Sequence, residues 1–151
     1  MCELKDVQFL NINSGAIHIE NKLDLLPRQL WLYLVYKALP VMKSGVTSFK
    51  INLSELKNSI GYNSKNNKYL KKALKDLVNT TVEWNIFNKE QEIWGCSSLL
   101  SDCEIVTISN IATCEYSFSQ KIIERFINPN MYLKLNLFIS KEFTSKHSLS
   151  I

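Results

Sequence analysis

Side chains that could carry catalysis or hold a metal are few in this chain and widely spaced. The four cysteines form no C-x-x-C pair, and the only histidines that could complete a metal site are His18 and His147. Neither histidine stands in a motif with a nucleophile and an orienting carboxylate, and no paired acidic residues suggest metal-assisted strand cleavage. We therefore expect no catalytic residue, no metal and no cofactor, and we expect that the chain is not an enzyme.

Glycine-rich phosphate loops are missing as well. The chain has 4 glycines, and neither G-x-x-x-x-G-K-[ST] nor G-x-G-x-x-G occurs in it. Cys103 and Cys114 fall in stretches typical of strands, where a reduced thiol acts as a small hydrophobic side chain. Nucleotide binding and thiol chemistry therefore have no support in the sequence.

Five lysines in one short stretch form the strongest candidate for a binding surface. At about 100° per residue they occupy one arc of a helix, and the members of this set are Lys65, Lys68, Lys71, Lys72 and Lys75. The opposite arc is apolar and consists of Tyr69, Leu70, Ala73, Leu74 and Leu77. Such lysines can neutralise DNA phosphates without reading bases, and Asn66 and Asn67 are the only candidate base readers beside them. The alternative is a solvated helix face that contacts no partner.

The composition fits one compact globular domain. Of the 151 residues, 46% are hydrophobic and 21% are charged, and the formal net charge of +4 permits a polyanionic partner without proving one. The longest apolar run, Leu30–Tyr36, is far shorter than the roughly twenty residues that a membrane-spanning helix needs. The N-terminus carries charges of both signs and no apolar signal core. We therefore expect a cytoplasmic protein without membrane contact.

Two prolines bound the first long helix that we expect, which begins at Leu25. Pro27 fits the first turn, where its missing N–H costs no hydrogen bond, and Pro40 is expected to end the helix at about Leu39. The middle of this helix is apolar nearly all round, so it is either central to the fold or covered by another chain. The candidate dimer residues lie on this helix and on a later strand, and they are Leu30, Tyr33, Leu34, Ile105 and Ile108. The alternative is that these residues fill one elongated core.

Two helices joined by a tight turn are expected next. Asn52 and Glu55 are spaced to cap the first of them reciprocally, and Gly61 supplies the left-handed residue that ends it. Ser64 is positioned to cap the second helix. The expected elements up to this point are short strands at Ala16–Ile19 and Ser48–Leu53, a helix at Leu53–Ile60 and a helix from Ser64 to Val78.

Strands dominate the remainder of the chain. Trp84 alternates with Val82 and Ile86, which favours a core position over stacking on nucleobases. A turn at 109–111 predicts a hairpin. The expected elements are strands at Thr81–Phe87, Glu104–Ile108 and Ala112–Phe118, a segment Glu92–Leu100 that pairs back or forms a loop, a helix at Gln120–Ile127, an extended stretch at Tyr132–Leu137 and a last helix from Ser140 or Thr144.

The order of these elements is that of a winged helix. The fold class that we expect is α+β, with a helix-turn-helix, an antiparallel β-hairpin wing and extra helices. A wider pattern over Leu23–Ile151 resembles the N-terminal winged-helix domain of the plasmid replication initiator (Rep) proteins of the iteron-binding class. The residues that carry the resemblance are Phe49-x-Ile51-x-Leu53-Ser54-x-Leu56, Gly61, Tyr69-Leu70-x-x-Ala73-Leu74-x-x-Leu77, Val82-x-Trp84, Trp94, Leu99-Leu100, Tyr116-Ser117-Phe118-Ser119 and Ser145-Lys146-x-Ser148.

The resemblance implies a DNA-binding role in plasmid replication. Members of that family carry two winged-helix domains, bind repeated sites at an origin and dimerise through the N-terminal domain. The domain division expected here is an extension over residues 1–22 and a winged-helix domain over residues 23–151, cut before a second one that makes most base contacts in relatives. The implied partners are double-stranded DNA at a plasmid origin, a second copy of the chain and host replication proteins.

Two other functions are compatible with the same pattern. A stand-alone winged-helix transcription regulator would share the fold and the lysine arc. A protein-interaction module would share them too, but its lysines would never touch DNA. A second helix-turn-helix pattern beyond Ile151 would favour the replication initiator over both.

Overall fold

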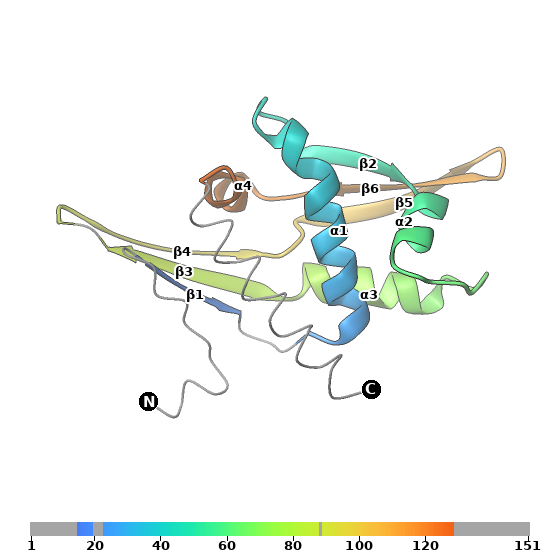
Figure 1. Cartoon of the computed structure of the whole chain (residues 1–151), viewed down its shortest axis with the longest axis horizontal. Helices are drawn as coiled ribbons and strands as arrows, with labels where there is room; N and C mark the ends of the chain where they lie inside the picture. Colours follow the sequence, from blue (N-terminus) through green and yellow to red (C-terminus); the bar gives the residue numbers. More distant parts are fainter. Residues whose placement is uncertain (1–14, 20–22, 88, 129–151) are drawn as a thin grey trace.

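The computed structural model describes residues 15–19, 23–87 and 89–128, and these residues form four helices and six strands (Figure 1). The elements in chain order are β1 (Gly15–Ile19), α1 (Leu25–Met42), β2 (Ser48–Asn52), α2 (Leu53–Ser59), α3 (Lys68–Val78), β3 (Thr81–Phe87), β4 (Glu92–Ser98), β5 (Asp102–Ile108), β6 (Ile111–Ser117) and α4 (Gln120–Phe126). The extended stretch expected at Tyr132–Leu137 and the last helix expected from Ser140 or Thr144 lie outside the described residues. No helix in the described part is long and apolar enough to cross a membrane.

The strands pair antiparallel and build two three-stranded sheets. One sheet has the order β1-β3-β4 and the other has the order β2-β6-β5. In Figure 1 the β3–β4 hairpin extends to the left and the β5–β6 hairpin to the right. The segment Glu92–Leu100, which the sequence left open between a strand and a loop, therefore supplies a strand that pairs back on β3.

Helix α1 lies in the centre of the fold. Leu30 and Leu34 have no exposed surface. The indole N–H of Trp31 donates a hydrogen bond to the carbonyl of Leu99 at 3.0 Å, and the hydroxyl of Tyr116 donates to the carbonyl of Leu34 at 2.9 Å. The helix is thus bound both to the link between β4 and β5 and to β6, and its buried residues fill the core, while Tyr36 and Lys37 remain exposed.

The helix-turn-helix and its wing are both present. Helices α2 and α3 follow β2, and the β5–β6 hairpin pairs with β2 to complete the sheet. Ser109 and Asn110 form the tip of the wing with φ values of 51° and 67°. Left-handed conformations at both central residues are what a two-residue hairpin of this kind needs, because they match the twist of the strands. The expected winged-helix fold, with extra elements around it, is confirmed.

Trp84 is a core residue, as its alternation predicted. Its exposed fraction is 5%, and Val82 on the same face of β3 has none. The indole of Trp84 lies across the neighbouring strand, directly over its register partner Gly95. A Cβ added to Gly95 would lie 2.5 Å from Nε1 of Trp84, so only glycine leaves room for the ring at this position.

Three local predictions were wrong. Pro40 does not end α1, because the helix continues to Met42, whose burial in the core outweighs the one hydrogen bond that proline removes. Glu55 does not complete a reciprocal cap with Asn52; its carboxylate instead accepts from Tyr33 and pairs with Lys37. Helix α3 begins at Lys68 rather than directly after Ser64, for reasons given below.

Candidate nucleic-acid interface

A chain of local hydrogen bonds shapes the turn that leads into α3. The Asn52 side chain caps α2 by accepting from the backbone N–H of Ser54 at 2.8 Å. After Gly61, whose φ is +70°, the hydroxyl of Tyr62 donates to the carbonyl of Asn66 at 2.6 Å. The Ser64 hydroxyl accepts from the N–H of Asn66 at 3.0 Å. These bonds satisfy backbone groups in a turn instead of a helix, and α3 consequently starts later than the capping pattern predicted.

Lys57 strengthens this turn from within α2. Its Nζ donates to Oδ1 of Asn67 at 2.8 Å and lies 5.5 Å from the centre of the Tyr62 ring. An ammonium group at that distance over an aromatic face is attracted to the ring. Lys57 therefore fixes the approach to α3. The sequence interpretation did not single it out, although a lysine five residues before a tyrosine in a tight turn was the available signal.

The predicted lysine set lies on the surface. Lys68, Lys71, Lys72 and Lys75 are exposed on α3, while Leu70, Ala73, Leu74 and Leu77 on the other side of that helix are buried. Lys65 is also exposed, but it lies in the turn before α3 and not on the helix. Tyr69 was expected on the apolar side and is 63% exposed, because it stands at the margin of that stripe.

One of these lysines already has an acidic partner. Nζ of Lys72 lies 3.1 Å from a carboxylate oxygen of Asp76, one helical turn away. Among the described residues no ion pair engages Lys65, Lys68, Lys71 or Lys75. Four cationic groups are therefore available to an anionic partner on this surface. We call the whole surface, with the paired Lys72 included, the lysine face (Lys65, Lys68, Lys71, Lys72 and Lys75).

The two candidate base readers are occupied within the chain. Oδ1 of Asn66 accepts from the backbone N–H of Lys68 at 2.9 Å. Oδ1 of Asn67 accepts from Lys57. Reading a base edge with both the oxygen and the amide of an asparagine needs that oxygen free. The geometry of the turn thus favours contacts to the DNA backbone over contacts to bases.

A groove runs between α3 and β5, with a volume of about 360 Å³. Lys71 and Lys75 line its helix side, and Ile105 and Thr107 line its strand side. Leu74 contributes to the apolar part of its wall. The groove places two lysines of the lysine face beside the edge of the wing sheet.

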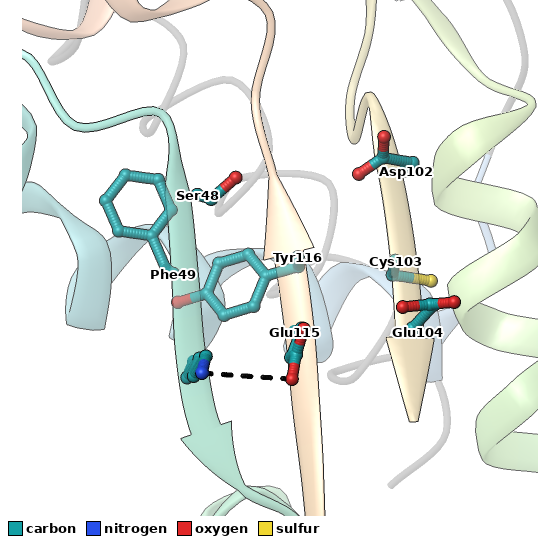
Figure 2. A pocket seen from close by; sticks show the side chains of 8 residues that line it. Ser48, Phe49, Asp102, Cys103, Glu104, Glu115 and Tyr116 are labelled. Atoms are coloured by element: carbon teal, nitrogen blue, oxygen red, sulfur yellow. Dashed lines mark ion pairs between the residues drawn. The ribbon is translucent and has the colours of Figure 1, made fainter. Parts of the chain in front are cut away.

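The opposite face of the wing sheet carries acidic side chains. A hollow there, also of about 360 Å³, is lined by Asp102, Glu104 and Glu115, whose side chains are labelled in Figure 2. Nζ of Lys50 lies 4.0 Å from Glu115, and the hydroxyl of Ser117 donates to Asp102. With three carboxylates against one lysine, this face repels phosphates. The described residues hold no group of three or more side chains that could ligate a metal ion.

The thiols of the wing sheet are poor nucleophiles. Burial, with smaller contributions from Cys103 and Glu115, raises the pKa of the Cys114 thiol to about 12. Burial, together with the charge of Asp102, also raises the pKa of the Cys103 thiol. Both cysteines are free. They act as small hydrophobic groups in β5 and β6, as the sequence indicated.

The five candidate dimer residues do not form one surface. Leu30 and Leu34 have no exposed area and fill the chain's own core, so neither is accessible to a second copy of the folded domain. Tyr33 and Ile105 are half-buried. Ile108 is 69% exposed at the wing tip, where it pairs with Ile111, an exposed residue that the sequence interpretation did not include.

Tyr33 has a partner within the chain. Its hydroxyl donates to a carboxylate oxygen of Glu55 at 3.0 Å, and Lys37 lies 3.0 Å from the same oxygen. Lys37 first, and Tyr33 second, hold the pKa of Glu55 below its usual value. This network fastens α2 to α1 and so helps to hold the helix-turn-helix in place.

Comparisons with known proteins found a family model and solved structures that are similar to this chain. The family model described as "Initiator Replication protein, WH1" matches residues 13–151. The WH1 domain of MSBI1.176, a replication protein isolated from a multiple sclerosis patient, has 19% sequence identity and a TM-score of 0.49, covering 81% of this chain and 86% of that one. Domains 2 and 3 of RctB have 8% identity and a TM-score of 0.50, covering 93% of this chain and 62% of that one. No curated protein matches the chain.

Proposed function

The chain belongs to the initiator replication protein WH1 family, and from that membership we propose that it forms the domain of a plasmid replication initiator that holds the DNA backbone at origin repeats and dimerises. Its lysine face contacts phosphates, and it has no enzymatic activity of its own. A second winged-helix domain following residues 23–151 reads the origin sequence. This role also implies a cytoplasmic location and contact with host replication proteins.

The observation that carries the proposal is the polarity of the wing region. The lysine face presents four cations that no described carboxylate neutralises, whereas the acidic hollow lies on the other side of the wing sheet. A polyanion is therefore attracted to one side and repelled from the other. Because Asn66 and Asn67 are occupied, the contacts that remain are with phosphates, which fix the position of the protein without reading sequence.

DNA binding by this domain should be weak, nearly independent of sequence and strongly dependent on salt. Each lysine that contacts a phosphate adds roughly 0.9 to the slope of log affinity against log salt concentration. Titration of duplexes that differ in sequence, each at several salt concentrations, measures both properties. A slope near zero, or a large preference for one duplex, would contradict backbone binding through the lysine face.

Self-association should depend on the wing tip. Ile108 and Ile111 are 69% and 60% exposed and face each other across the turn, so they offer apolar surface that a second copy can bury. Sedimentation over a range of concentrations should show a dimer in the parent and a monomer in the I108S/I111S variant. Replacement of Ile127, exposed by 41% at the end of α4, is the matched control. A strictly monomeric parent at high micromolar concentration would contradict the dimer.

A further inference from the structure

Strand β5 lines the groove beside α3 and is an edge strand of its sheet. Strand β5 is the last strand of the β2-β6-β5 sheet, so within the described residues one of its edges has no strand partner. The two-residue turn makes Ile108 and Ile111 the first hydrogen-bonded pair, and the alternate residues then direct their backbone groups away from β6. The N–H of Phe118 donates to the carbonyl of Thr47 at 3.1 Å. The even-numbered residues of β6 therefore direct their backbone groups towards β2, which agrees with this assignment. The backbone N–H groups of Ile105 and Thr107 therefore point away from β6 at the edge of the sheet, and both residues line the groove.

Several donors meet in this groove. Lys71 and Lys75 line it from α3, at positions one helical turn apart. Thr107, an exposed residue on the side of β5 that also carries Ile105, adds a hydroxyl. With the two edge N–H groups, the groove offers charged and neutral donors of the kinds that contact phosphate oxygens in protein–DNA complexes.

We propose that this groove is a phosphate site, in which Lys71, Lys75, Thr107 and the edge of β5 hold one phosphodiester of the DNA backbone. The inference rests on the proposed function for its ligand, since DNA supplies the phosphodiester. It goes further because it assigns the phosphate to particular residues of the lysine face. Lys71 and Lys75 belong to the site, whereas Lys65 and Lys72 do not. The DNA backbone accordingly passes between α3 and the wing.

Charge limits where the phosphate lies. Glu104 lines both the groove and the acidic hollow, so the groove holds two lysines against one carboxylate. Its lysine side is cationic and its rim beside Glu104 is not. A phosphate is therefore held near α3 and the inner face of β5, and it is kept off the outer face of the sheet.

Inorganic phosphate tests the site without DNA. Amide-resolved NMR titration should shift the signals of Ile105 and Thr107 in a saturable way. The K71Q/K75Q variant should weaken this binding about tenfold or more, and T107V should weaken it by a smaller factor. Lys121 is the matched control, because it is an exposed lysine of α4 outside both the lysine face and the groove and is paired with Glu124, so K121Q should leave the titration unchanged. Absent shifts at these amides, or shifts that persist in K71Q/K75Q, would overturn the site.

A second titration with a short duplex separates the two proposals. DNA should shift the same amides, and K71Q/K75Q should reduce the salt slope by about 1.8. If DNA binds without moving the groove amides, the phosphate site is refuted and the proposed function stands. If inorganic phosphate binds there but no duplex does, the anion site stands and its assignment to the DNA backbone is overturned together with the proposed function.

Discussion

Replacing Trp84 or Leu74 with alanine is expected to lower the free energy of unfolding by about 2–5 kcal/mol in each case. Trp84 is 5% exposed and Leu74 is 2% exposed. Each substitution removes a large apolar group and leaves a cavity that the neighbouring strands and helices can close only in part. Chemical denaturation of the parent and of each variant gives the difference in free energy directly.

Trp94 provides the matched control for Trp84. It belongs to the adjacent strand β4, is 60% exposed and donates its indole N–H to Glu83 at 3.1 Å on the surface. Its replacement by alanine should change the free energy of unfolding by no more than about 0.5 kcal/mol. A change that small for Trp84 itself would mean that its ring is not in the core, and stacking on nucleobases would then need to be considered again.

Alternation of apolar residues was enough to locate most of the sheet. Val82 and Trp84 identified β3, and Phe49 and Ile51 identified β2, because one face of each strand is buried and the other is not. Asn52 was recognised as a cap, and its side chain accepts from the backbone N–H of Ser54, as a cap should. These signals are local, so a single sequence contains them.

Two of the predictions that failed depended on contacts between distant parts of the chain. Glu55 has the spacing of a capping residue, but Tyr33 and Lys37 on α1 bind its carboxylate instead. The apolar run on α1 could not show whether Leu30 and Leu34 face the core or a partner, since that depends on which strands cover the helix. The groove between α3 and β5 was likewise invisible, because its walls are about thirty residues apart in the sequence.

Exchanging the four helical lysines of the lysine face for glutamine should reduce DNA affinity by roughly 10²–10³-fold near 0.1 M salt and lower the salt slope by up to about 3.6. The variant is K68Q/K71Q/K72Q/K75Q. All four side chains are exposed, and glutamine has nearly the helix propensity of lysine, so α3 should keep its structure. Fluorescence anisotropy with a labelled duplex measures the affinity, and circular dichroism with thermal unfolding checks the fold.

A second quadruple variant separates a local contact from a general effect of charge. Lys43, Lys50, Lys89 and Lys121 are exposed lysines outside the lysine face, and replacing them by glutamine removes the same four positive charges. Both variants have a formal net charge of zero, since four charges are taken from +4. Only the variant on α3 should lose binding steeply if phosphates lie against that helix. Equal losses would indicate nonspecific attraction to the whole molecule, and retention of the parent's affinity by the α3 variant would leave these lysines as a solubilising surface.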